Sequence, residues 1–193
     1  MYRPIQALVV YLCLVGVSRG QGSAQAAISG TTSVPLFAIS WNLTNNYVQY
    51  DARLKDGKFD PKQPVTAYWI MKQTDGHREA LTMIERLKGY GFTVHPGGEP
   101  DTFDMVVVSV KKKTLHIAHN ADPLPNASAN QITSQFPSQF SVTLSIGNCE
   151  TARLTEAHVQ AHWWHFFPEG DYVDLTGIDV KTGAECHERV MHE

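Results

Sequence analysis

The sequence of 193 residues lacks most of the features that would place it in a well-known functional class. Charge is scarce, with 16 basic against 19 acidic side chains, and this excludes a nucleic-acid binder that works by neutralising phosphates. The glycine-rich motifs that bind phosphates or dinucleotides are absent, and so is the Gly-x-Ser-x-Gly motif of serine hydrolases. Because 42% of the residues are hydrophobic and 10% aromatic, the chain is too apolar to be disordered. It is also too short for a TIM barrel, so we expect one globular domain.

Long hydrophobic runs are missing too, apart from one short run near the start. Residues 5–17 are almost entirely apolar, but these 13 residues are too few for a membrane-spanning helix, which needs about 20. Such a run after a basic residue is typical of a secretory signal, and Ala24-Gln25-Ala26 fits the small-x-small cleavage motif. We therefore predict a signal peptide over residues 1–26 and a single exported domain over residues 27–193, with no membrane span after removal of the signal. A cut near Gly20 and an uncleaved anchor are the alternatives.

The predicted export bears on the covalent chemistry of the chain, which has few cysteines. Removal of residues 1–26 would take away one of the three cysteines, together with two arginines and no acid, so the net charge would fall from −3 to −5. Cys149 and Cys186 then remain as an even pair in a secreted or periplasmic protein, and we predict that they form a disulfide. Two buried free thiols are the alternative. Asn42 and Asn126 begin N-glycosylation acceptor motifs, which matter only in a host that glycosylates its exported proteins.

Alternation of apolar and polar residues dominates the rest of the chain and predicts β-strands. Turn signals such as Asp56-Gly57 and Asp75-Gly76 separate the alternating segments at short intervals. Leu81, Ile84 and Leu87 instead follow helical spacing, so we predict one short α-helix at about residues 78–88. The predicted fold is mainly β, an antiparallel β-barrel or closed β-sandwich of about 8–10 strands with this helix packed on it. The expected strands include residues 37–41, 48–50, 65–70, 106–110, 115–118, 140–146 and 172–180.

Histidines are the first candidates for chemistry, and His158 and His162 lie four residues apart. On a strand these two side chains share a face while His165 points to the other, so a three-histidine metal site within this segment is not expected. No glutamate follows the first histidine, which excludes the zincin motif. We expect solvated histidines on a polar face and no cofactor, and we keep the pair His158 and His162 as an alternative metal site.

A catalytic serine is the second candidate. Ser109 and Lys112 match the Ser-x-x-Lys motif of serine β-lactamases, and Lys181-Thr182-Gly183 matches a second motif of those enzymes. The third motif, Ser-Asp-Asn, is absent, and Ser109 ends an alternating apolar run instead of starting a helix. No catalytic residue is therefore assigned.

Aromatic residues are the remaining candidates, for ligand binding. Those that face inward belong to the core, whereas a contiguous group that faces outward would recognise a sugar, a peptide or a lipid. Trp163 and Trp164 are neighbours on a predicted strand, so they point to opposite faces. The candidate ligand-binding residues are Trp41, Tyr68, Trp163 and Trp164.

Several short segments form an ordered set along the chain. They are Pro35-Leu36-Phe37-Ala38-Ile39, Asn46-Tyr47-Val48-Gln49-Tyr50-Asp51, Pro64-Val65-Thr66-Ala67-Tyr68-Trp69-Ile70, Gly76-His77-Arg78-Glu79, Gly89-Tyr90-Gly91, residues 172–183 and Glu188-Arg189-Val190. Over about residues 34–190 this set resembles the uncharacterised DUF4833 domain of exported bacterial proteins. The resemblance implies an exported domain without an established activity, so it assigns no catalytic residues. Trp41-Asn42 and Thr44 stand where the family tends to have an Arg-Ser pair and an Asn, so a polar site there would be lost or altered.

These patterns together predict a non-catalytic exported module that binds a small ligand or an envelope protein. In a barrel the ligand would lie at the mouth of the interior. A metal-dependent hydrolase that uses His158 and His162 is the alternative, and a structural envelope protein is a third. No nucleic-acid partner is expected.

Overall fold

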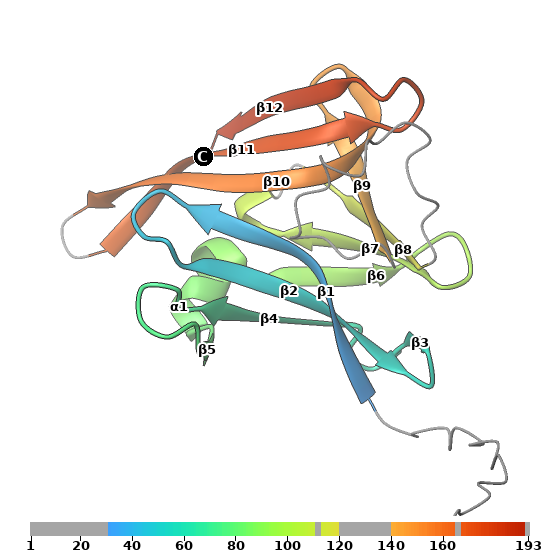
Figure 1. The fold of residues 1–193 in the computed structure, drawn as a ribbon, viewed down its shortest axis with the longest axis horizontal. Coiled ribbons are helices and arrows are strands. Elements are labelled where there is room, and N and C mark those ends of the chain that lie inside the picture. Colours follow the sequence, from blue (N-terminus) through green and yellow to red (C-terminus); the bar gives the residue numbers. More distant parts are fainter. Residues whose placement is uncertain (1–30, 111–112, 120–139, 165–166, 192–193) are drawn as a thin grey trace, which may run out of the picture.

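The computed structural model describes residues 31–110, 113–119, 140–164 and 167–191, apart from the side chains of residues 163–169. The predicted signal peptide and the acceptor motif at Asn126 lie outside these ranges. Within the described part of the chain, twelve strands form one sheet (Figure 1). The strands are β1 (Thr31–Trp41), β2 (Tyr47–Lys55), β3 (Lys58–Phe59), β4 (Val65–Ile70), β5 (Arg78–Ala80), β6 (Phe92–Pro96), β7 (Thr102–Val107), β8 (Leu115–His119), β9 (Phe140–Ile146), β10 (Cys149–Trp164), β11 (Phe167–Asp179) and β12 (Glu185–Met191).

The main path of the sheet has nine strands in the order β5-β4-β2-β1-β10-β9-β8-β7-β6. It curls strongly into a half-barrel, and β11 and β12 extend it beyond β10 (Figure 1). Neighbouring strands are antiparallel except β1 and β10, which run parallel with Ser40 opposite His158. The prediction of a mainly β, barrel-like or sandwich-like fold with one short helix is therefore confirmed.

Apolar side chains from the concave face fill the interior of the half-barrel. Phe37 and Tyr50 stack there with ring centroids 4.6 Å apart. The Tyr50 hydroxyl donates a hydrogen bond to the carbonyl oxygen of Tyr90 at 2.9 Å, which ties the core to the helical segment. Burial raises the pKa of Tyr50 well above its usual value, so its hydroxyl stays neutral. The largest fully buried side chains are Tyr50, Phe37, Ile39, Met105, Leu115, Ile117, Ile146, Leu175, Val48, Val65, Val107 and Val173.

The helical segment consists of α1 (Met83–Glu85) and the π-helical turn η1 (Arg86–Tyr90). It starts later than the predicted residue 78, because residues 78–80 pair with β4 as strand β5. A capping box fixes the start: the Thr82 hydroxyl accepts from the backbone N–H of Glu85, and the Glu85 carboxylate accepts from the backbone N–H of Thr82.

The side chains of this segment that face the core also differ from those that the apolar spacing predicts. Leu81 is buried as expected, but Ile84 and Leu87 are 55% and 66% exposed. Glu85 turns inward instead, where its Oε1 accepts a hydrogen bond from the indole nitrogen of Trp69 at 3.0 Å. The segment is too short, and its π-turn too irregular, for the three-residue spacing to hold one face against the sheet.

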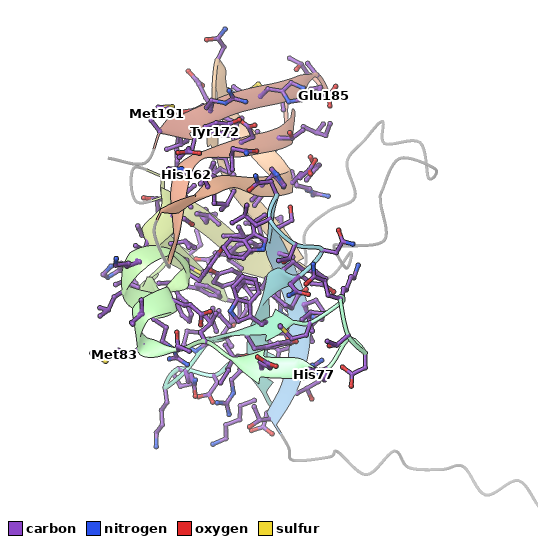
Figure 2. All side chains as sticks on the ribbon, turned by 90° about the vertical axis from the view of Figure 1, so that its left-hand side faces the viewer. His77, Met83, His162, Tyr172, Glu185 and Met191 are labelled. Carbon is purple, nitrogen blue, oxygen red and sulfur yellow. A yellow bond between two sulfur atoms is a disulfide. The ribbon has the colours of Figure 1, made fainter. Side chains whose placement is uncertain are left out.

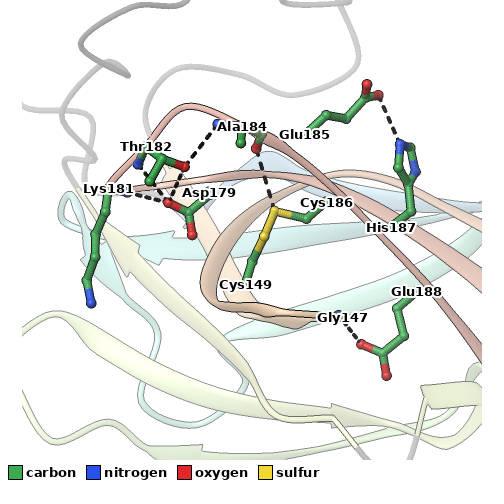
Figure 3. The surroundings of a disulfide bond; sticks show 10 residues. All are labelled: Gly147, Cys149, Asp179, Lys181, Thr182, Ala184, Glu185, Cys186, His187 and Glu188. Carbon is green, nitrogen blue, oxygen red and sulfur yellow. Dashed lines mark hydrogen bonds and ion pairs between the residues drawn. A yellow bond between two sulfur atoms is a disulfide. The ribbon is translucent and has the colours of Figure 1, made fainter.

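The predicted disulfide between Cys149 and Cys186 is present (Figure 3). Cys149 begins β10 and Cys186 lies in β12, and their Cα atoms are 6.3 Å apart. The bridge joins the turn between β9 and β10 to the last strand of the sheet. Glu188 adds a second link, because its carboxylate accepts from the backbone N–H of Gly147 at 2.6 Å. No helix in the described ranges is long and apolar enough to cross a membrane.

Candidate ligand-binding site

A cavity of about 270 Å³ lies between the helical segment and the adjoining ends of β1, β10 and β11. Trp41 at the end of β1 and Trp69 in β4 contribute one side. The helical segment contributes another through Thr82, Ile84, Glu85 and residues 88–90. Ser109 enters from the short 3-10 turn η2 (Val108–Val110). A second cavity of about 620 Å³ lies on the other side of the helical segment, between Leu87 and β6.

Four aromatic residues line the first cavity: Trp41, Trp69, Tyr90 and Tyr172. The ring centroids of Trp41 and Trp69 are 5.6 Å apart and tilted, and those of Trp69 and Tyr90 are 5.0 Å apart in an edge-to-face arrangement. Both indole N–H groups are already bonded: Trp41 donates to the Thr44 hydroxyl at 2.6 Å, and Trp69 donates to Glu85. Because their polar edges are satisfied, the rings offer the cavity mainly apolar surface.

Glu85 supplies the cavity with an acidic group that is fixed from two sides. Its Oε1 accepts from Trp69 and its Oε2 from the Thr82 hydroxyl at 2.8 Å. Nearby Tyr90 is 7% exposed, and burial, with a contribution from the Glu85 charge, raises the pKa of its hydroxyl well above the usual value. The polar groups of the lining therefore include the Glu85 carboxylate, the Lys88 side chain and the phenols of Tyr90 and Tyr172.

Ser109 is the unusual member of this site. The residue is only 7% exposed, and its hydroxyl has no hydrogen-bond partner within the described part of the chain. A buried hydroxyl without a partner costs about 1–3 kcal/mol, so such groups are rare in folded proteins. Ser109 also belongs to the residues that line the cavity.

The aromatic candidates predicted from the sequence lie in different surroundings. Trp41 lines the cavity. Tyr68 lines neither cavity: its hydroxyl donates to Asp51 at 2.6 Å, and the Arg78 guanidinium lies over its ring. Trp163 and Trp164 belong to the backbone of β10, but their side chains lie outside the described part.

Sequence reasoning did not select Trp69, Tyr90 or Ser109 for the site. Trp69 could have been found from the alternation in residues 65–70, had the pairing of β4 with β2 been known, because Trp69 lies opposite Val48 and Val48 opposite Ile39. Tyr90 ends η1 and Ser109 lies in η2, and the Ser-x-x-Lys match at Ser109 indicated catalysis, not ligand binding.

The two histidines of the alternative metal site have separate partners. His158 Nδ1 lies 2.9 Å from the Ser40 hydroxyl, and His162 Nδ1 lies 2.7 Å from an Asp171 carboxylate oxygen. In the ranges that the structure describes, one group of three metal-type ligands is close enough to share an ion, namely Cys149, Asp179 and Cys186. Its two sulfur atoms are joined in the disulfide.

His158 instead belongs to a polar row that crosses four strands. Ser40, His158, Asp174 and Arg189 lie opposite one another in register on β1, β10, β11 and β12. Arg189 donates two hydrogen bonds to Asp174, at 2.8 and 2.9 Å, and stacks on the Tyr172 ring. The Arg189 hydrogen bonds lower the pKa of Asp174. Figure 2 shows this region of the sheet, near Tyr172 and Met191, well away from Met83 on the helix. Neither cavity includes His158, Asp174 or Arg189.

Asn42 is the glycosylation candidate that lies within the described residues, and its side chain forms hydrogen bonds to the backbone. Its Nδ2 donates to the carbonyl oxygen of Ala161 at 3.0 Å, and its Oδ1 accepts from the Ala161 N–H at 2.8 Å. A glycan on Nδ2 would have to disturb this contact between the end of β1 and β10.

Comparison with known proteins identifies the family. No curated protein matches the chain significantly, and neither does any solved structure. Residues 37–189, which include every residue of the cavity lining, match the family described as Domain of unknown function (DUF4833). The resemblance seen in the sequence is thus confirmed, and the chain belongs to the DUF4833 family.

Proposed function

We propose that this domain is a non-catalytic binding module that holds one small, mainly apolar aromatic molecule in the cavity between the helical segment and the sheet. The observation that carries the proposal is the Ser109 hydroxyl, which is buried beside the aromatic wall without a partner in the described residues. A ligand that hydrogen-bonds to this hydroxyl would remove the desolvation cost of leaving it unpaired.

The size and chemistry of the cavity limit its occupant. A volume of about 270 Å³ suits a compact molecule of one to three rings. Trp41, Trp69 and Tyr90 favour a flat apolar body, because aromatic surfaces stack or meet edge to face. Ser109 favours one polar group on that body, and Glu85 disfavours an anionic group placed close to it.

The surroundings of Ser109 support binding over catalysis. A nucleophilic serine needs a base within hydrogen-bond reach, and Ser109 has no such contact in the described part of the chain. Glu85 is the one acidic group in the lining, and Thr82 and Trp69 occupy its oxygens.

We also propose that the domain works outside the cytoplasm. The Cys149–Cys186 disulfide supports this, because disulfides persist mainly in oxidising compartments. The apolar run at residues 5–17 supports export in the same sense.

A fluorescence titration with N-phenyl-1-naphthylamine tests the binding site, because this probe is a compact aromatic with one N–H donor. We expect saturable binding of one probe per chain, and binding about tenfold weaker in Trp69→Leu, since one aromatic contact is worth about 1.4 kcal/mol.

Phe103→Leu is the matched control. Phe103 is a buried aromatic residue of the core, 4% exposed, that lines neither cavity. Equal loss of probe binding in both variants, or unsaturable binding to the wild type, would contradict the proposed site.

A further inference from the structure

Three apolar side chains of the helical segment point into solvent, and we call them the apolar turn: Met83, Ile84 and Leu87. Their exposed fractions are 77%, 55% and 66%. In the described part of the chain, Val180 and Met191 are the other large hydrophobic residues that are exposed. Figure 2 shows Met83 at the outer edge of the molecule, on the side of the helix away from the sheet.

The apolar turn is held in this position by a defined set of contacts. The capping box between Thr82 and Glu85 fixes its start. The Arg86 guanidinium Nε donates to the carbonyl oxygen of Leu81 at 3.2 Å, and Leu81 is buried in the core. Trp69 holds the Glu85 side chain from inside. The exposure of the three apolar residues is therefore built into the fold.

The exposed charged side chains next to the apolar turn, on the same segment, are positive. Arg86 and Lys88 are exposed on the same segment, and neither forms an ion pair within the described residues. The one acid of the segment, Glu85, faces inward. On the neighbouring strand β5, Arg78 lies over the Tyr68 ring and Glu79 pairs with His77. Arg86 and Lys88 thus form a basic rim beside the apolar turn, on a chain whose net charge is −3.

We propose that the apolar turn docks on an anionic lipid membrane, with its three apolar side chains at the boundary of headgroups and acyl chains and with Arg86 and Lys88 among the headgroups. Apolar side chains beside lysine or arginine on one helical face are the features that bind membrane interfaces.

A second copy of the chain fits less well, because three side chains fall far short of the roughly 800 Å² per partner of a stable protein interface. The basic rim would also face itself in such a dimer. The proposal stands independently of the proposed ligand, although Ile84 and Lys88 belong to both sites and place the cavity beside the docked surface.

Vesicle co-sedimentation tests this docking, with the protein in the form that an exporting host releases. The vesicles contain either phosphatidylcholine alone or phosphatidylcholine mixed with phosphatidylglycerol. We expect binding to the anionic vesicles that weakens with salt, and about fivefold weaker binding for each of Arg86→Gln and Lys88→Gln, the factor for one basic residue at an anionic surface. We expect Met83→Asp combined with Leu87→Asp to reduce binding by at least tenfold.

Met191→Asp is the matched control, because Met191 is 57% exposed on the last strand and carries the same change of charge. Met83 and Leu87 do not line the first cavity, so probe binding should survive in the double variant and show that it is folded. Three results would overturn the proposal: no binding of the wild type to anionic vesicles, equal loss in Met191→Asp, or equal binding of the wild type and the double variant. A dimer in sedimentation velocity that the double variant abolishes, without vesicle binding, would overturn it in favour of self-association.

Discussion

Replacing Ser109 by alanine removes a buried hydroxyl that has no partner within the described residues. The free energy of unfolding without ligand should therefore rise, by about 1 kcal/mol, because the unpaired hydroxyl carries a desolvation cost of about 1–3 kcal/mol and its removal leaves only a small void. The same change should weaken the binding of a ligand that hydrogen-bonds to the hydroxyl. Urea unfolding followed by circular dichroism, with and without N-phenyl-1-naphthylamine, measures both effects.

Ser40→Ala is the matched control for this experiment, because the Ser40 hydroxyl lies 2.9 Å from His158 Nδ1. Loss of a hydrogen bond of this kind should lower the free energy of unfolding by about 1 kcal/mol. The two serine variants should thus shift stability in opposite directions. If Ser109→Ala destabilises the protein as much as Ser40→Ala does, the hydroxyl is already satisfied, and the observation behind the proposed function is lost.

Three further predictions concern the framework around the site. Replacing Cys149 and Cys186 by alanine opens a 37-residue loop and should lower the free energy of unfolding by about 4 kcal/mol, while a loss below about 1 kcal/mol in urea unfolding would contradict loop closure as the cause. Arg189 lowers the pKa of Asp174, so this pair stabilises the fold above the unfolded-state pKa of about 3.9, and the contribution is lost as pH falls through the depressed value. Arg189→Gln should therefore reduce stability at pH 7 more than at pH 2 in thermal unfolding, and equal losses at both would count against it. Thr82→Ala removes the N-cap and should cost about 1 kcal/mol, and faster amide exchange confined to the helical segment would identify it as a local loss.

Much of the strand content could be predicted from the sequence, because alternation reports which residues share a face. The run from Phe140 to Ile146 alternates buried and exposed positions as its pattern requires. The order of the strands could not be predicted in this way. The parallel contact of Ser40 with His158 joins residues 118 positions apart, and nothing local in either segment encodes it.

The helical segment shows how a tertiary contact overrides periodicity. Leu81, Ile84 and Leu87 have the spacing of a buried helical face, yet only Leu81 is buried. The bond between Glu85 and Trp69 decides which side faces the core, and it depends on a strand that is distant in sequence. The spacing could not reveal this pairing.

The sequence predicts only part of the candidate site, because the rest depends on contacts between distant segments. Trp41 could be selected because aromatic residues in strands are conspicuous. The motif match at Ser109 indicates catalysis, whereas the burial of its hydroxyl without a partner in the described residues is a property of the folded chain alone.

The parallel contact between β1 and β10 also determines when the cavity can exist. Trp41 stands opposite Val159, so that side of the cavity closes only after the chain has been made as far as β10. Folds with such distant contacts form slowly, because the entropy of closing the intervening loop is lost before the contact can stabilise the fold. During synthesis the aromatic wall would therefore be exposed until late. The cavity is therefore completed only by strands made late in synthesis, although its lining from Trp41 to Ser109 is made well before them.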